Sequence, residues 1–163
     1  MTKVLITGSF DPVTVGHFSL VQKAAAIFDE VTLCLFVNPD KTYRFTLDER
    51  LEMLRCGACE LGLSNVTVDA SQGYVADYAA QKGIPFVLRG IRNGEDAYYE
   101  LDMARYNHAR NPALETLFWA ADDQLAGISS TAVRKSLEKG VIPEDALLSS
   151  TVSLIQKYQK NGK

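Results

Sequence analysis

The chain has 163 residues, a formal net charge of −3, and 47% hydrophobic and 23% charged residues. This length indicates a single domain over residues 1–163, and this composition excludes a disordered chain. The charge favours neither nucleic acid nor an anionic membrane as a partner, and without a bilayer-spanning apolar run or a signal-like cleavage region we expect a cytoplasmic protein.

Short apolar runs alternate with longer amphipathic segments along the chain. Strands are predicted at residues 4–7, 31–37, 66–68, 86–88 and 117–120. Helices are predicted at residues 16–28, from residue 47 onward, and at residues 75–82, 95–110, 129–139 and 144–160. In the first helix, the i, i+4, i+7, i+8 spacing predicts a buried face of Leu20, Ala24, Ile27 and Phe28.

The alternation of strands and helices predicts an α/β fold, a Rossmann-like, doubly wound, five-stranded parallel sheet with helices on both faces. In such sheets, ligands bind outside the carboxyl ends of the strands, where the strand order reverses. We therefore expect the residues that carry chemistry to lie just after the strands.

The chain has three cysteines, of which Cys56 and Cys59 form a C-x-x-C pair. A redox pair of this kind is expected at the start of a helix, where the thiolate is stabilised. This pair falls late in a predicted helix, and no second pair offers the spacing of a zinc site. The pattern favours a role in helix packing.

The first candidate motif runs from Gly8 to His17, between the first predicted strand and helix, and reads Gly-Ser-Phe-Asp-Pro-Val-Thr-Val-Gly-His. It contains neither the dinucleotide fingerprint nor a P-loop. Ser9 follows a glycine that a phosphate can approach closely, and His17 lies at a helix start, where free N–H groups favour anions. The alternative is that Thr14 is only a helix cap and His17 a surface residue.

Two further motifs carry cations. Lys41 lies in a proline-marked loop after the second strand, where its flexible ammonium could reach a phosphate, although a solvated surface lysine is the alternative. Arg89 and Arg92 flank Gly90 after the fourth strand, and arginine suits bidentate phosphate recognition. The alternative is a basic loop paired with neighbouring acidic residues, Glu95 and Asp96.

The fourth motif is Gly-Ile-Ser-Ser-Thr-Ala-Val-Arg, residues 127–134. Its serines and threonine are good helix N-caps whatever the function. The free N–H groups of such a helix start can also hold a nucleotide.

The Thr-x-Gly-His string at residues 14–17 resembles the signature of the nucleotidylyltransferase superfamily. Together with Gly-Ser-Phe-Asp-Pro, it is similar to the bacterial phosphopantetheine adenylyltransferase family. The resemblance spans about residues 3–135, with the four motifs in the family's order. It departs at Ser9, where threonine is commoner, at residues 72–75, which are less apolar, and most of all after Gly140.

The resemblance implies transfer of the adenylyl group of ATP to 4′-phosphopantetheine, giving dephospho-CoA and pyrophosphate. The acceptor phosphate attacks in line, and the protein stabilises the transition state electrostatically. Mg²⁺ is expected to arrive with the ATP, without a metal site of the protein's own. The resemblance also implies a homo-oligomer, a homohexamer in this family.

It implies roles for individual residues. His17 is expected to stabilise the phosphoryl oxygens and Lys41 to orient the acceptor phosphate, and these two are assigned as catalytic together with Arg92. The residues expected to bind the acceptor are Ser9, Lys41, Val75 and Arg89. The residues expected to bind ATP are Ser9, Phe10, His17, Gly90, Ile91, Arg92, Glu100, Leu125, Ala126, Gly127, Ile128, Ser129, Ser130 and Thr131.

Two alternatives stay open. A nicotinamide-mononucleotide adenylyltransferase or a cytidylyltransferase more often has H-x-G-H, whereas this chain has Thr14. A nucleotide-binding regulator without turnover would be supported by a lost histidine or arginine in these motifs, and none is lost here.

Overall fold

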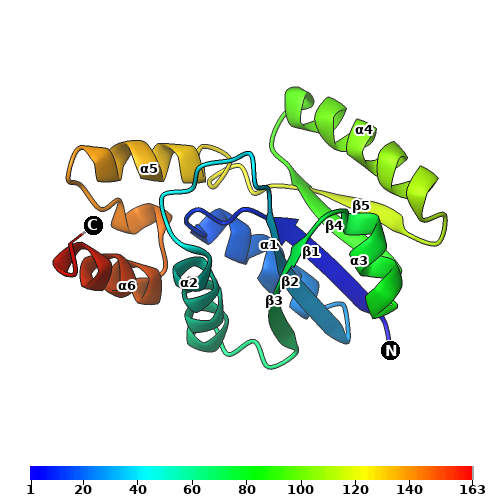
Figure 1. Cartoon of the computed structure of the whole chain (residues 1–163), viewed down its shortest axis with the longest axis horizontal. Helices are drawn as coiled ribbons and strands as arrows, with labels where there is room; N and C mark the ends of the chain where they lie inside the picture. The colour runs from blue at the N-terminus through cyan, green and yellow to red at the C-terminus, as the bar shows by residue number, and fades with distance from the viewer. Residues whose placement is uncertain (163) are drawn as a thin grey trace.

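A five-stranded parallel sheet with helices on both faces forms the framework of the computed structural model, which describes residues 1–162 (Figure 1). The strands are β1 (Lys3–Gly8), β2 (Glu30–Val37), β3 (Val66–Gln72), β4 (Phe86–Ile91) and β5 (Glu115–Ala120). The helices are α1 (Val15–Ala25), α2 (Leu47–Glu60), α3 (Val75–Lys82), α4 (Gly94–Arg110), α5 (Ser130–Glu138) and α6 (Ser149–Lys160), with a 3₁₀ turn at Glu144–Ala146. The predicted fold class is confirmed.

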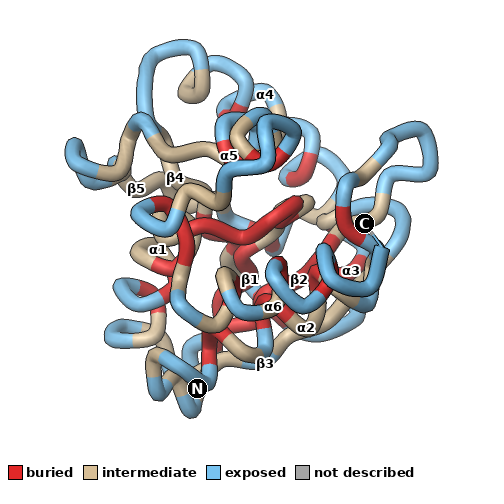
Figure 2. Tube along the Cα trace, turned by 90° about the vertical axis from the view of Figure 1, so that its left-hand side faces the viewer, coloured by how far each residue is buried: buried red, intermediate tan, exposed pale blue. Residues whose placement is uncertain are grey.

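Side chains alternate between the two faces of the sheet and build two apolar layers. On β1, Val4 and Ile6 join a cluster that includes Phe18 of α1, Leu54 of α2 and residues of α5 and α6. Leu5, between them, joins a second cluster with residues of α3. The central residues of β1 and β2 are accordingly buried, whereas the central residues of β5 at the sheet edge are only half-buried (Figure 2).

The strand order is β3-β2-β1-β4-β5. The chain therefore builds outward from β1 through β2 to β3, then returns to the other side of β1 for β4 and β5. This reversal lies between β1 and β4, and the crevice at their carboxyl ends is where such folds bind ligands.

The structure corrects the first predicted helix. The helix ends at Ala25, two residues before Ile27. Ile27 therefore does not continue the buried face of the helix and is 66% exposed. The buried residues of α1 are Phe18, Val21 and Ala24.

The last predicted helix, residues 144–160, is two pieces. Leu147 and Leu148 have extended backbone, which places Leu147 in the core. α6 then starts anew, and Glu60 of α2 accepts the Ser150 N–H at 2.8 Å, which satisfies one free donor of its first turn. Apolar spacing continues through this break, so the sequence pattern does not reveal it.

The fourth strand is longer than predicted. It continues through Ile91, which pairs with Ala120 of β5, so Arg89 and Gly90 lie on the strand itself. Arg89 is thereby held by the sheet, and Arg92 is the first residue beyond it.

Within residues 1–162, no helix is both long and apolar enough to cross a membrane.

Candidate active site

A pocket of about 440 Å³ opens at the carboxyl ends of β1 and β4. Its walls come from the loop after β1, the start of α1, the end of β4, the first turns of α4, the loop after β5 and the start of α5. Twelve residues expected at the site line it: Ser9, Phe10, His17, Arg89, Gly90, Arg92, Glu100, Leu125, Ile128, Ser129, Ser130 and Thr131. The fold thus gathers three of the four sequence motifs around one cavity.

His17 is held by its own helix start. The Thr14 N–H donates to Nδ1 of His17 at 3.0 Å, and the His17 N–H donates to the Thr14 hydroxyl at 3.4 Å. The imidazole thus takes the place of the acidic or amide side chain of an ordinary capping box. Because Nδ1 is an acceptor here, the neutral ring carries its proton on Nε2.

Burial lowers the pKa of His17 from 6.5 to about 4, with further lowering by the positive charges of Arg89 and Arg92. The ring is therefore neutral at neutral pH and offers one Nε2–H to the pocket. The Phe10 ring packs edge-on against it, with centroids 5.1 Å apart. Thr14 is indeed a helix cap, and His17 is a pocket residue rather than an isolated surface residue.

Arg89 is fixed on two sides. Its Nη1 donates to the Thr7 carbonyl at 2.6 Å and to the Thr7 hydroxyl at 2.8 Å. Nε and Nη2 donate to the two carboxylate oxygens of Glu100 at 2.8 and 2.7 Å. These bonds use four of the five guanidinium N–H donors and leave one on Nη2.

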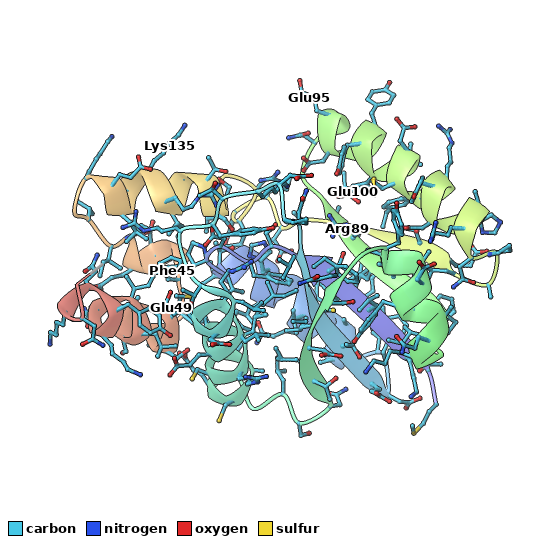
Figure 3. The ribbon with its side chains drawn as sticks, in the orientation of Figure 1. Phe45, Glu49, Arg89, Glu95, Glu100 and Lys135 are labelled. Carbon is cyan, nitrogen blue, oxygen red and sulfur yellow. The ribbon has the colours of Figure 1, made fainter. Side chains whose placement is uncertain are left out.

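Glu100 comes from α4 and is 7% exposed, so the Arg89 ion pair is formed away from bulk solvent. Figure 3 shows Arg89 and Glu100 together beside α4, whereas Glu95 extends outward from the start of that helix. Glu100 is therefore part of the site's interior, and it is engaged with an arginine.

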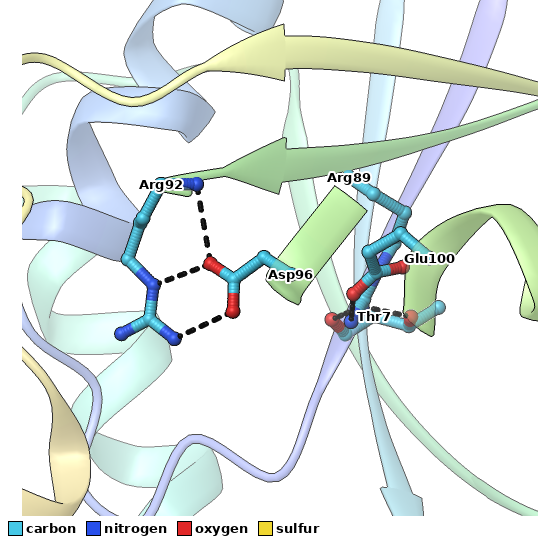
Figure 4. A network of polar contacts seen from close by, with 5 residues as sticks. All are labelled: Thr7, Arg89, Arg92, Asp96 and Glu100. Carbon is cyan, nitrogen blue, oxygen red and sulfur yellow. Dashed lines mark hydrogen bonds and ion pairs between the residues drawn. The ribbon is translucent and has the colours of Figure 1, made fainter. Parts of the chain in front are cut away.

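Arg92 is held by a different carboxylate, that of Asp96 (Figure 4), at the exposed rim of the pocket. Its Nε and Nη2 donate to the Asp96 carboxylate at 2.8 and 3.2 Å, and its side chain is 42% exposed. The hydrogen bond from Arg92 lowers the pKa of Asp96. The alternative interpretation of a basic loop paired with acidic neighbours thus applies to Arg92 and Asp96.

The start of α5 is tied to the loop after β1. The Ser129 hydroxyl accepts the Ala132 N–H at 3.1 Å as an N-cap, and the Ser130 hydroxyl donates to the Pro12 carbonyl at 2.8 Å. Arg134 Nη1 donates to the Asp11 carbonyl at 2.7 Å. The fourth motif and the first therefore form one wall.

Five expected residues do not line the pocket: Lys41, Val75, Ile91, Ala126 and Gly127. Lys41 is exposed on the loop between β2 and α2. Val75 begins α3 and packs against the second apolar cluster. Ile91, the last residue of β4, is half-buried and follows the pocket residue Gly90.

Several pocket residues were missed from the sequence. Asp122, two residues after β5, accepts hydrogen bonds from Ser19 at 2.7 Å and Lys23 at 2.6 Å, and the rule that ligands bind after strands could have pointed to it. Arg134 follows Thr131 by one helical turn, a spacing that places both on one face. Thr7 ends the first predicted strand, but nothing in the sequence indicated its contact with Arg89, which is 82 residues away.

No group of three or more His, Cys, Asp or Glu residues within residues 1–162 is arranged to hold a metal ion. The cations that line the pocket are Lys23, Arg89, Arg92 and Arg134. The arrangement suits an extended polyanion, because positive groups and a neutral N–H donor face one cavity.

Comparison with known proteins adds independent findings. The chain matches the cytidylyltransferase-like family over residues 5–136. It is 39% identical over 142 residues to the phosphopantetheine adenylyltransferase of Frankia alni, which covers 86% of this chain and 87% of that protein.

Proteins of the same name are similar from Finegoldia magna, 40% identical over 149 residues (88% and 91% covered), and from Heliobacterium modesticaldum, 36% over 159 residues (97% and 94%). Among solved structures, a putative nicotinate-nucleotide adenylyltransferase from Vibrio parahaemolyticus superposes with a TM-score of 0.70. It is 19% identical and covers 96% of this chain and 93% of its own, a likeness that shows the fold.

Proposed function

This chain belongs to the cytidylyltransferase-like family and, within it, to the phosphopantetheine adenylyltransferases, and we propose that the pocket described above is its active site. The protein transfers the adenylyl group of ATP to 4′-phosphopantetheine. The products are dephospho-CoA and pyrophosphate, so the reaction is a step of coenzyme A biosynthesis.

The chemistry needs positioning more than proton transfer. An oxygen of the acceptor's phosphate monoester, with a second pKa of about 6, is already ionised near neutral pH and needs no protein base. That oxygen forms a bond to the α-phosphorus of ATP while the bond from this phosphorus to the bridging oxygen breaks, and pyrophosphate leaves with the electron pair. The protein holds the acceptor phosphate and the α-phosphate in line for this displacement. It also stabilises the negative charge on the non-bridging oxygens of the α-phosphate.

The observation that carries this proposal is the state of His17. A neutral imidazole with Nδ1 already bonded presents a single donor, Nε2–H, to the pocket that Arg89 and Arg92 also line. A preorganised donor of this kind stabilises charge that develops on a phosphoryl oxygen. We assign His17 to the α-phosphate oxygens in the transition state.

The cations share the remaining charge. Arg89 contacts the acceptor through its remaining N–H, and Arg92 contacts the ATP phosphates after exchanging Asp96 for them. Lys41 orients the acceptor phosphate from its exposed loop, with Ser9 beside it and Val75 along the pantetheine arm. Glu100 holds Arg89. The further residues that we assign to ATP are Phe10, Gly90, Ile91, Leu125, Ala126, Gly127, Ile128, Ser129, Ser130 and Thr131.

Magnesium enters as part of the substrate. Mg²⁺ keeps several waters and binds well to phosphate oxygens, so MgATP needs no dedicated protein cage. The donor set of the pocket fits this, because none of its four carboxylates is left without a partner. Glu100, Asp96 and Asp122 are each bonded to a cationic side chain, and Asp11 accepts two backbone N–H groups.

The outer face of α4 supports the proposal of a homo-oligomer, a homohexamer by family resemblance. Tyr98, Tyr99, Leu101 and Tyr106 are 75%, 63%, 42% and 45% exposed on this helix. Large exposed apolar side chains gathered on one element are typical of an interface. We also propose a cytoplasmic location, in keeping with the three free cysteines.

Pyrophosphate release tests the function directly. The purified protein is incubated with MgATP alone, with MgATP and phosphopantetheine, with MgATP and nicotinamide mononucleotide, and with MgCTP and phosphopantetheine. We expect release only from MgATP with phosphopantetheine. Release with the mononucleotide or from CTP would favour another nucleotidylyltransferase, and no release in any mixture would favour a nucleotide-binding regulator.

A further inference from the structure

Asp11 is a buried carboxylate for which the mechanism above has no role. It is 3% exposed, and both of its oxygens accept backbone N–H groups from a distant segment. Oδ2 accepts the Arg44 N–H at 2.9 Å, and Oδ1 accepts the Phe45 N–H at 3.0 Å. These donors lie just before α2, so the carboxylate joins the loop after β1 to the loop after β2.

The segment that Asp11 holds carries Lys41. Its turn is closed on itself, because the Lys41 N–H donates to the Asn38 carbonyl at 3.1 Å and the Asn38 N–H donates to the Tyr43 hydroxyl at 3.0 Å. These two bonds join residues 38–43 into one closed turn. The Asp11 carboxylate attaches it to the rest of the molecule three and four residues after the lysine.

The loop that contains Asp11 is itself fixed from two other elements. Arg50 of α2 is 2% exposed, and its Nη1 donates to the Ser9 carbonyl at 2.9 Å. The guanidinium of Arg50 also stacks on the Tyr43 ring, 4.0 Å from its centroid. Arg134 of α5 donates to the Asp11 carbonyl at 2.7 Å, and its Nη1 lies 3.9 Å from Oδ2 of the Asp11 carboxylate. The Lys41 turn is thus attached to the loop after β1, the same backbone segment that leads to His17.

We propose that Asp11 is a positioning residue that sets where Lys41 stands relative to the pocket. A carboxylate suits this role because it supplies two acceptors to two neighbouring N–H donors. An amide in its place would keep one acceptor and turn its NH₂ group toward the other donor. The proposal rests on the function proposed above, in which Lys41 orients the acceptor phosphate.

The anchor itself can be tested without substrates, by amide hydrogen exchange of the wild-type protein. We expect the Arg44 and Phe45 amides to exchange slowly although they lie outside helices and strands, because a buried carboxylate holds them. Exchange at the rate of an unprotected loop would overturn the proposal. Because this measurement needs no turnover, its failure is distinct from a failure of the proposed activity in the pyrophosphate assay.

The role in positioning is tested with Asp11→Asn, Lys41→Ala and the double variant. We expect Asp11→Asn to raise KM for phosphopantetheine about tenfold, as loss of one charged hydrogen bond would, and to leave KM for ATP within about twofold. In the Lys41→Ala background, Asp11→Asn should add less than about twofold, because both changes act through one ammonium. Asp48→Asn, the same change at an exposed site of α2, is the matched control and should leave both constants unchanged.

Two outcomes would overturn the proposal. One is an equal rise of both KM values in Asp11→Asn, which is what a general loosening of the fold would give. The other is full multiplication of the two single effects in the double variant. If Asp11→Asn does not fold, Tyr43→Phe keeps the ring on Arg50 and removes the hydroxyl that closes the turn. It should raise KM for phosphopantetheine alone, and unchanged constants there would equally count against the proposal.

Discussion

Arg89 and Arg92, the two arginines of the third motif, are three residues apart and lie in different environments. Arg89 lies on β4 and makes four hydrogen bonds, two to Thr7 and two to a nearly buried Glu100. Arg92 lies one residue beyond the strand and is bonded to Asp96 at the solvent-exposed rim. We call Thr7, Arg89 and Glu100 together with His17 the inner cluster, and Arg92 with Asp96 the rim pair.

This difference separates two ways to bind a polyanion. The inner cluster is organised before the substrate arrives, so no bond has to be broken for its groups to act. The rim pair holds its arginine in an exchangeable ion pair, where solvent and salt weaken the attraction. Inner-cluster changes should therefore damage catalysis, and rim changes should affect ATP binding in a salt-dependent way.

The largest effect is expected from His17→Ala in the inner cluster. Loss of one preorganised donor to a developing negative charge should lower kcat by about 10²–10³-fold. ATP affinity, measured by calorimetry, should change little, because the donor acts mainly in the transition state. A kcat close to that of the wild type would contradict the role of His17.

Glu100→Gln is the next largest. It removes a charge from a mostly buried ion pair and frees Arg89 to turn, so we expect a loss of about 2 kcal/mol in the free energy of unfolding, below the value for fully buried pairs. We also expect kcat/KM for phosphopantetheine to fall by about 10-fold or more, through the displaced Arg89. Asp102→Asn, on the same helix but 78% exposed, is the matched control for urea unfolding.

The Glu100 variant also separates two roles. If Glu100 acts by holding Arg89, the affinity for ATP alone stays within about twofold in the calorimeter, a change that corresponds to less than one hydrogen bond. A selective loss of ATP binding would show instead that Glu100 contacts the nucleotide directly, and the contrast between inner cluster and rim would then be weaker.

Arg92→Lys should have a moderate effect at the rim. A lysine keeps the charge and loses the bidentate geometry, so KM for ATP is expected to rise by about fivefold. Added salt should raise KM for ATP in both the wild type and the variant, because each has an exposed charge that is screened. A fall in kcat as large as that of the His17 variant would place Arg92 among the inner groups.

Asp96→Asn should have a smaller effect, in the opposite direction. It removes the carboxylate that competes with phosphates for Arg92, so ATP should bind about two- to threefold more tightly at low salt. Titration calorimetry at two salt concentrations measures this gain. Weaker binding would mean that Asp96 helps to aim Arg92 rather than compete for it.

The smallest effect is expected from pH: between pH 5.5 and 8 the protonation state of His17 should not change. Because its folded pKa lies near 4, below the ordinary value of 6.5, the ring stays neutral through this range. Its depressed pKa also means that the unfolded chain binds a proton first, so this group lowers stability as pH falls from about 6.5 toward 4. Nitrogen-15 spectra should show an Nε2–H tautomer without titration, and an imidazolium at pH 6 would contradict this.

Much of the fold was predictable because buried parallel strands are continuous apolar runs, as in residues 31–37. The ends were not. Arg89 and Gly90 do not look like strand residues, and it is pairing with β5 that extends β4 over them. The break before α6 was hidden because Leu147 and Leu148 suit a helix as well as they suit the core.

The site was predictable where its residues are close in sequence, as in the string from Gly8 to His17. Partners that meet only in the fold were not, and Glu100 had no local sign of its ion pair with Arg89. The same holds for Asp11, whose two donors are 33 and 34 residues away. Sequence motifs point to the groups that we propose meet substrate, whereas the contacts that orient those groups come from tertiary structure.

The central claim is most directly tested by a crystal structure with a non-hydrolysable ATP analogue and phosphopantetheine. We predict that Nε2 of His17 lies within hydrogen-bonding distance of an α-phosphate oxygen, that Arg89 keeps Thr7 and Glu100, and that Arg92 has left Asp96 for a phosphate. A His17 ring turned away from the triphosphate, or an Arg89 released from Glu100, would contradict the account.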